Sequence, residues 1–179
     1  VGRVVKDKGI VELITAFTMI SKMRKDVYLL LVGPLEQELD PLPEEVMLFI
    51  QNDMHVIVTG FQSDVRAWMM ASDVFVFPSY REGFPNVVMQ AACLEVSCIV
   101  SDINGCNEII EDNKSGLIVP PKDTNALYEA MQVIMSDEEK RRSYAVKARE
   151  FVSQNFDQQF VWAELLGEYC RLLSFKPKV

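Results

Sequence analysis

Short apolar runs that suit buried strands alternate with segments of helical spacing along most of the chain. The strand-like runs cover residues 1–5, 27–32, 55–58, 73–77, 97–100 and 117–119. Helices are expected at residues 9–25, 43–52, 64–70, 85–95, 108–111, 124–135, 137–154 and 157–173. This order predicts an α/β fold, in which one parallel sheet of six strands carries helices on both faces. The 179 residues, 49% of them hydrophobic, suit a single domain with a substantial core.

The unusual loop residues fall at one edge of this predicted sheet. Residues 3–8, 33–34, 60–61, 82–86 and 102–107 each follow a strand-like run. Open parallel sheets bind their ligands beyond the carboxyl ends of the strands. The loops at the opposite edge read as ordinary polar turns, so the sequence predicts a site at the carboxyl edge.

One stretch, residues 74–90, contains the most informative of these loops. The apolar run at 74–77 leads into a loop with Glu82 and Gly83, and Pro85 suits the first position of the helix that follows. The free N–H groups and the dipole of a helix N-terminus favour an anion. Gln90, about two turns along, is expected to be a buried amide that needs a hydrogen-bond partner. Such a unit alone is most often an ordinary piece of an α/β fold.

Two cations strengthen the case for an anion site. Arg3 and Lys8 flank the loop after the first strand-like run. Facing the helix that begins near Pro85, they would form a diphosphate site. Glu82 could accept hydrogen bonds from sugar hydroxyls at such a site. Two plainer interpretations stay open: Lys8 lies in water at the end of a loop, and Glu82 only compensates the dipole of the helix that follows it.

Composition and motif spacing exclude several other functions. A net charge of −8 and a pI near 4.7 argue against nucleic acid or anionic lipid as partners of the segment as a whole. The single His55 and four cysteines without C-x-x-C spacing predict no metal site, no catalytic triad and a reduced, cytoplasmic protein. The sequence lacks an initiator Met and opens inside a strand-like run, so we expect it to be part of a longer protein.

A series of short motifs follows in order along nearly the whole chain. The motifs are Val1-Gly2-Arg3 with Lys8-Gly9, Leu30-Leu31-Val32-Gly33, Val58-Thr59-Gly60, Ala71-Ser72-Asp73 through Pro78-Ser79, Glu82-Gly83-Phe84, Ala91, Ser101-Asp102, Glu108-Ile109-Ile110, and Ser115-Gly116 through Pro120. This series resembles glycosyltransferase family 4, and the resemblance is specific to the C-terminal, nucleotide-sugar-binding half of a GT-B enzyme.

The resemblance implies a Rossmann-like domain over residues 1–179, with the N-terminal acceptor-binding domain outside this chain. It implies that Arg3 and Lys8 stabilise the leaving nucleoside diphosphate and that Glu82 contacts the donor sugar, as catalytic residues. Nucleotide-sugar binding is implied for Gly60, Phe61, Gly83, Phe84, Pro85, Asn86, Val87 and Gln90. The implied enzyme is a retaining, hexosyl-type glycosyltransferase that needs no metal or cofactor, and the isolated segment is expected to turn over little.

The implied donor is a nucleotide-sugar, and the implied acceptor is a glycan or lipid-linked molecule held by the missing domain. This suits surface polysaccharide or glycolipid synthesis in the cytoplasm, with the full-length protein at the inner face of the membrane as an open alternative. The residues 160–173 resemble the helix that crosses back toward the acceptor domain. The base, the sugar, the acceptor and the oligomeric state are not predicted.

Two departures from the family pattern keep alternatives open. Gln90 stands where the second glutamate of the family motif is expected, and Asn107 where the family often has proline. An amide offers one acceptor oxygen where a carboxylate offers two, so ribose binding is expected to weaken or re-orient. The alternatives are a non-catalytic, degenerate partner domain and a GT-B sugar-nucleotide epimerase or hydrolase. A plain dinucleotide-binding domain is disfavoured, because no G-x-G-x-x-G follows the first strand.

Overall fold

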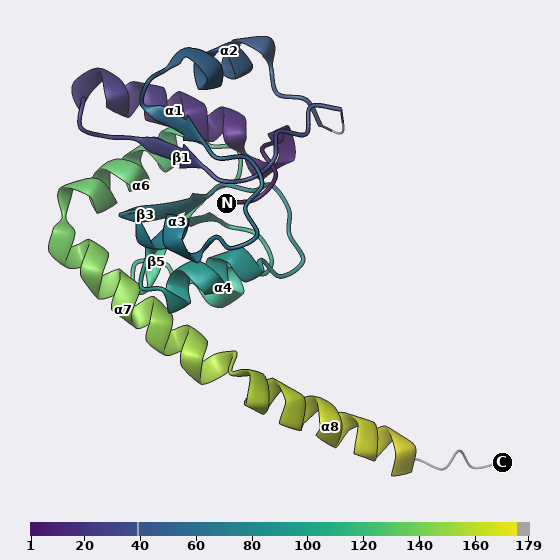
Figure 1. Ribbon diagram of the computed structural model, residues 1–179. Coiled ribbons are helices and arrows are strands. Elements are labelled where there is room, and N and C mark those ends of the chain that lie inside the picture. The colour runs from purple at the N-terminus through teal and green to yellow at the C-terminus, as the bar shows by residue number, and fades with distance from the viewer. Residues whose placement is uncertain (39, 175–179) are drawn as a thin grey trace.

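The computed structural model describes residues 1–38 and 40–174, and Figure 1 shows its α/β architecture. Two parallel sheets form the centre. One pairs β1 (Leu29–Leu31) with β2 (Val56–Val58), and the other has the order β3-β4-β5, with β3 at Val74–Phe77, β4 at Ser97–Ser101 and β5 at Gly116–Val119. All strand pairs are parallel, as the alternation of strands and helices predicts.

Helices occupy most of the remaining chain. After the 3-10 turn η1 (Lys6–Lys8) they are α1 (Ile10–Met23), α2 (Glu44–Asn52), α3 (Arg66–Met70), α4 (Asn86–Cys93), α5 (Cys106–Ile109), α6 (Thr124–Ser136), α7 (Glu138–Asn155) and α8 (Gln158–Ser174). The last three lie within one residue of the predicted bounds. Their starts are well specified, because the carboxylates of Asp123 and Asp137 accept hydrogen bonds from the N–H groups of Ala126 and Lys140.

The predicted fold class is confirmed, but the number of strands differs. Residues 1–5 form no strand: Val4 makes one isolated parallel bridge to Leu35, and the N–H of Gly2 donates to the carbonyl of Val32 at 2.8 Å. These contacts lie beyond the carboxyl end of β1. Within residues 1–38 and 40–174, no strand pairs with both β1 and β3. The described strands therefore form two sheets, and the prediction of one six-stranded sheet is wrong in this respect.

Helices cover both faces of the sheets, and each side has its own apolar core. One core joins α1, α2 and α6 and includes Phe17, Leu127 and Ile134. The other joins α4, α5 and α7 and includes Val88 and Ile109. Strand β4 is buried at every position, because the two cores meet on its opposite faces.

Helix α8 differs from the others because every one of its described residues is exposed. It leaves the end of α7 and extends away from the sheets (Figure 1). Its exposed large apolar residues are Phe160, Val161, Trp162, Leu165, Leu166, Tyr169, Leu172 and Leu173. Among the described residues, the helices lack the combination of length and apolar character that crossing a membrane requires.

Candidate functional site

Lys8 and Glu82 meet at the carboxyl edge of the sheets. The Nζ of Lys8, in η1, donates to Oε1 of Glu82, in the loop after β3, at 2.5 Å. The hydroxyl of the buried Ser79 donates to the same oxygen at 2.8 Å. The side chains of Lys8 and Glu82 are only 20% and 17% exposed, so solvent screens this pair less than a surface pair. The structure thus brings together two of the three residues expected to be catalytic.

The backbones of the two loops pack closely enough to require glycine. Gly9 follows η1 with a φ of 68°, and a Cβ added there would lie 2.0 Å from the carbonyl oxygen of Pro78. The N–H of Tyr80 donates to the carbonyl of Asp7 at 2.9 Å and ties the same two loops together. The position of Lys8 beside Glu82 is therefore fixed by backbone contacts as well as by charge.

Arg3 has a different partner. Its guanidinium lies 3.3 Å from the carboxylate of Glu36, and its side chain is 47% exposed. Arg3 and Lys8 both line a cavity between the two sheets, whereas Glu82 is not among the residues of that cavity. The described contacts therefore place Lys8, but not Arg3, against the Glu82 carboxylate.

The loop from Gly83 to Val87 leads into α4 and is supported from behind. Pro85 precedes the helix as its N-cap residue, one position earlier than expected, and no side chain caps the helix. Gly105 has a φ of 81°, and a Cβ there would lie 2.6 Å from the carbonyl oxygen of Gly83. The loop before α5 thus holds the glycine loop in place, and Gly83 and Phe84 remain exposed.

Gln90 is exposed, and the expectation of a buried amide is wrong. Helix α4 buries Val88, Ala91 and Ala92, while Asn86 and Gln90, four residues apart, lie on its exposed side. The helix is therefore amphipathic rather than apolar all round. Gln90 shares its exposed side with the residue that opens the helix.

The loops after β1 and β2 lie at the same edge. Gly33 and Gly60 form an antiparallel bridge, and a Cβ added to Gly33 would lie 1.8 Å from the carbonyl oxygen of Gly2. Phe61 follows with 76% of its surface exposed. The predicted Gly60-Phe61 loop is therefore close to the loop that carries Arg3, with an aromatic ring free to stack.

Several polar groups near the site were not predicted. Besides Ser79, the hydroxyl of Tyr80 lies 2.8 Å from both carboxylate oxygens of Glu12, and Lys122 lies 4.7 Å from the centre of the Tyr80 ring. Burial and the nearby Glu12 raise the pKa of Tyr80. Only the place of Ser79 and Tyr80 directly after a strand at this edge could have drawn attention to them.

Three further residues, Asn107, Glu108 and His55, lie as the sequence predicts. Asn107 donates to the carboxylate of Asp102, and Glu108 accepts from the N–H of Gly105, so both are loop and cap residues. His55 lies at the opposite edge, beside Asp53 and Tyr28. Within the described part of the chain, no three His, Cys, Asp or Glu side chains are grouped so that they could hold a metal ion.

The comparisons with known proteins agree with this architecture. The family model described as "Glycosyl transferases group 1" matches residues 1–151. A capsular polysaccharide biosynthesis glycosyltransferase, CapM of Staphylococcus aureus, is 36% identical over 97% of this chain and 46% of its own length. An N,N'-diacetylbacillosaminyl-diphospho-undecaprenol alpha-1,3-N-acetylgalactosaminyltransferase of Campylobacter jejuni is 29% identical over 97% of this chain and 44% of its own.

A solved structure shares the fold. Anabaena Alr3699/HepE, in complex with UDP and glucose, superposes with a TM-score of 0.84 over 95% of this chain and 47% of its own, at 21% identity. The chain thus spans about half the length of the curated relatives it matches. Since the family model covers most of the sequence, and this includes the loops that carry Lys8 and Glu82, the chain belongs to the group 1 family of glycosyl transferases.

Proposed function

We propose that this chain is the donor-binding half of a retaining glycosyltransferase of family 4. The enzyme would transfer a hexosyl-type sugar from a nucleotide-sugar to a glycan or lipid-linked acceptor in surface polysaccharide or glycolipid synthesis. The observation that carries the proposal is the contact between Lys8 and Glu82 at the carboxyl edge of the sheets. A cation for a leaving phosphate and an acceptor for sugar hydroxyls are adjacent there, as transfer from a sugar diphosphate requires.

The hydrogen-bonding capacity of this pair supports the assignment. An ammonium has three donors, and Glu82 uses one of those on Lys8, so two remain for phosphate oxygens. On Glu82, Oε1 accepts from Lys8 and Ser79, while Oε2 makes no hydrogen bond to the residues that the structure describes. Oε2 is therefore available to a sugar hydroxyl.

The remaining charge of the leaving diphosphate would be met by other groups at the same edge. We propose that the N–H groups from Phe84 to Val87, at the uncapped start of α4, bind its oxygens. Arg3 would exchange its exposed partner Glu36 for phosphate. Gly60 and Phe61 would contact the base, and Gln90 the ribose. Fixed charges and dipoles would stabilise the leaving group, so the proposed reaction needs no metal or cofactor.

The acceptor side belongs to the rest of the proposed enzyme. The two curated relatives are more than twice the length matched here, and the name of one includes a diphospho-undecaprenol. We propose that a second domain binds the acceptor and that the exposed apolar residues of α8 contact that domain. The enzyme would act in the cytoplasm, at the inner face of the membrane when the acceptor is lipid-linked. The isolated segment would bind donor weakly and turn over little.

A transfer assay on the full-length protein tests this function. UDP-, GDP- and ADP-sugars are each supplied with lipid-linked and glycan acceptors, and Lys8→Ala is compared with Lys147→Ala, an exposed lysine on α7. Transfer from one donor class is expected, with an about 100- to 1000-fold lower rate for Lys8→Ala and an unchanged rate for Lys147→Ala. Nucleotide-sugar hydrolysis or epimerisation without transfer would contradict the proposal.

A non-catalytic partner domain is the second candidate, and Gln90 is the residue that favours it. If activity has been lost through this position, Gln90→Glu in the full-length protein should produce a large gain in transfer. In an active enzyme that has accepted the amide, the same substitution changes the rate little.

A further inference from the structure

Ser79 is the third member of the contact between Lys8 and Glu82, and it is the only fully buried one of the three. Its hydroxyl lies 2.8 Å from Oε1 of Glu82, and 3.3 Å from the carbonyl oxygens of Asp7 and Arg81. A serine hydroxyl has a single proton to donate. The carboxylate is both the nearest and the only charged acceptor of these three, so the proton goes to Glu82.

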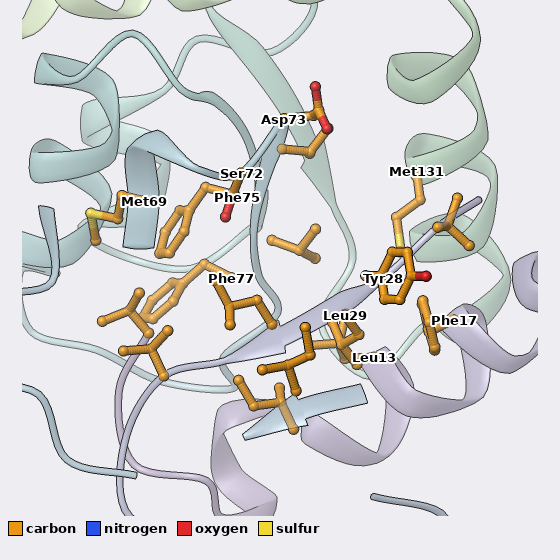
Figure 2. A pocket seen from close by; sticks show the side chains of 18 of the residues that line it. Leu13, Phe17, Tyr28, Leu29, Met69, Ser72, Asp73, Phe75, Phe77 and Met131 are labelled. Carbon is orange, nitrogen blue, oxygen red and sulfur yellow. The ribbon is translucent and has the colours of Figure 1, made fainter. Parts of the chain in front are cut away.

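The backbone around Ser79 fixes the position of this hydroxyl. Ser79 follows the end of β3 by two residues, and Figure 2 shows Phe75 and Phe77 of β3 among the side chains that line the cavity between the two sheets. These two rings stack with 5.9 Å between their centroids, and β3 pairs in parallel with β4. After Ser79, the N–H of Tyr80 donates to the carbonyl of Asp7. The hydroxyl is therefore carried on a rigid support between η1 and the loop after β3.

Lys8 holds Glu82 less well once a donor is bound. In the proposed function the ammonium also binds phosphate oxygens, which compete with the carboxylate for the same three N–H donors. The diphosphate also brings negative charge close to Glu82 and repels its carboxylate. The hydroxyl of Ser79 is neutral and buried, so phosphate does not compete for it. Its hydrogen bond to Glu82 should therefore matter more in the donor-bound protein than in the free protein.

The two donors act on the same oxygen of Glu82. Oε1 accepts from Lys8 and from Ser79, while Oε2 makes no hydrogen bond to the part of the chain that the structure describes. Two donors at one oxygen restrict the rotation of the carboxylate and leave the other oxygen for a sugar hydroxyl. Without Ser79, the carboxylate would be free to turn both oxygens toward Lys8. The ammonium and the free oxygen would then be less available to the donor.

We propose that Ser79 is a positioning residue for donor binding. Its buried hydroxyl keeps the Glu82 carboxylate in place, with Oε2 free, while the diphosphate engages Lys8. Ser79 itself makes no contact with the donor and acts only through Glu82. This role rests on the proposed donor site and adds to it the group that keeps its carboxylate in the binding orientation.

Calorimetric titration of the full-length protein with UDP-, GDP- and ADP-sugars tests this role. Ser79→Ala is compared with Ser97→Ala, a buried serine at the start of β4 whose hydroxyl has no hydrogen-bond partner within residues 1–38 and 40–174. Ser79→Ala should bind the donor at least about tenfold more weakly, as the loss of a hydrogen bond to a charged group predicts, and Ser97→Ala should bind it like the parent.

The same titration separates positioning from simple support of the fold. A serine that only supports the fold stabilises the free and the donor-bound protein equally. Ser79→Ala would then have a lower melting temperature but an unchanged dissociation constant for the donor. An unchanged dissociation constant would therefore overturn the proposal.

A double-variant cycle tests whether Ser79 acts through Glu82. The Glu82→Gln background lacks the carboxylate charge, so Ser79→Ala should weaken donor binding there by less than about twofold. An equal loss of affinity in both backgrounds would assign the effect to the carbonyls of Asp7 or Arg81 and overturn the proposal. If Glu82→Gln binds no donor, denaturant titrations decide: a smaller loss of unfolding free energy in this background supports the role, and an equal loss refutes it.

The role of Ser79 and the donor site can fail separately in these titrations. A parent protein that binds none of the three donor classes would refute the donor site and, with it, the role of Ser79. A parent protein that binds a donor no more tightly than Ser79→Ala does would refute the role of Ser79 alone.

Discussion

Lys8 and Glu82 are 74 positions apart in the sequence, yet the ammonium of one lies 2.5 Å from the carboxylate of the other. The contact arises because the loop after residues 1–5 and the loop after β3 leave the same edge of the fold and are joined through Gly9 and Pro78. Breaking this pair should therefore affect both the charge in the site and the positions of the two loops.

Lys8→Met, which keeps the apolar stem and removes the charge, should lower the turnover number of the full-length enzyme about 100- to 1000-fold. It should also lower the free energy of unfolding by about 1–3 kcal/mol, because Glu82 loses a hydrogen-bond partner in a partly buried place. The double variant with Lys8→Met and Glu82→Gln should lose less unfolding free energy than the sum of the losses in the two single variants. Strict additivity in denaturant titrations would show that the two side chains do not interact.

The glycines at the loop contacts should not tolerate alanine. Gly9→Ala and Gly105→Ala each place a Cβ against a backbone carbonyl, and each puts alanine at a positive φ that glycine tolerates. Each substitution should therefore lower the unfolding free energy by at least about 1–3 kcal/mol. Gly167→Ala is the matched control: it lies inside α8 with open space around it, and should be neutral or stabilising by about 0.5–1 kcal/mol. Equal melting temperatures for all three variants would contradict the packing described.

The exposed position of Gln90 predicts that its substitution tests ribose binding rather than folding. Gln90→Glu should leave the melting temperature within about 1–2 °C of the parent, since surface changes of this kind usually stay within 0.5 kcal/mol. Its effect should appear in the KM for the donor. A melting temperature that falls steeply would mean that the amide is buried in the full-length protein.

The buried thiols should be chemically silent at neutral pH. Burial raises the pKa of Cys98 and of Cys106 to about 12, and the Glu82 carboxylate adds to the shift at Cys106. The fold favours the neutral thiols, so their stabilising effect is complete below about pH 9 and declines as the pH rises toward 12. In the native protein at pH 8, a disulfide reagent should therefore label the exposed Cys93 and spare these two. Denaturant should release them, and labelling at the rate of Cys93 without denaturant would contradict their burial.

The order of elements could be read from the sequence because local signals are strong in this chain. Apolar runs, helical spacing and the N-cap residues Asp123 and Asp137 act over a few residues, and α6, α7 and α8 lie within one residue of their predicted bounds. The pairing of strands is different, because it depends on contacts between segments that are far apart in the sequence. Local signals therefore do not show that β1 pairs with β2 and is separate from β3. Residues 1–5 look like a strand locally, but the backbone pairs that they make, Gly2 with Val32 and Val4 with Leu35, lie beyond the end of β1.

The candidate site was predictable in its location but not in its contacts. Parallel topology places Arg3, Lys8 and Glu82 at one edge, but the sequence does not show that Glu82 bonds Lys8 while Arg3 bonds Glu36. Ser79 was missed because a serine after a strand is usually unremarkable, and its partner is fixed only by the turn of the loop. The sequence predicts a buried Gln90 because most of its neighbours in α4 are apolar, and this composition does not show that one side of the helix faces solvent.

Calorimetric titration of the full-length protein with UDP-, GDP- and ADP-sugars tests the central claim most directly. At least one donor class should bind, Lys8→Ala should weaken that binding at least about tenfold, as the loss of a charged hydrogen bond predicts, and Lys147→Ala should leave it unchanged. No binding by any of the three classes up to millimolar concentration, or equal affinity of Lys8→Ala and the parent, would contradict the donor site.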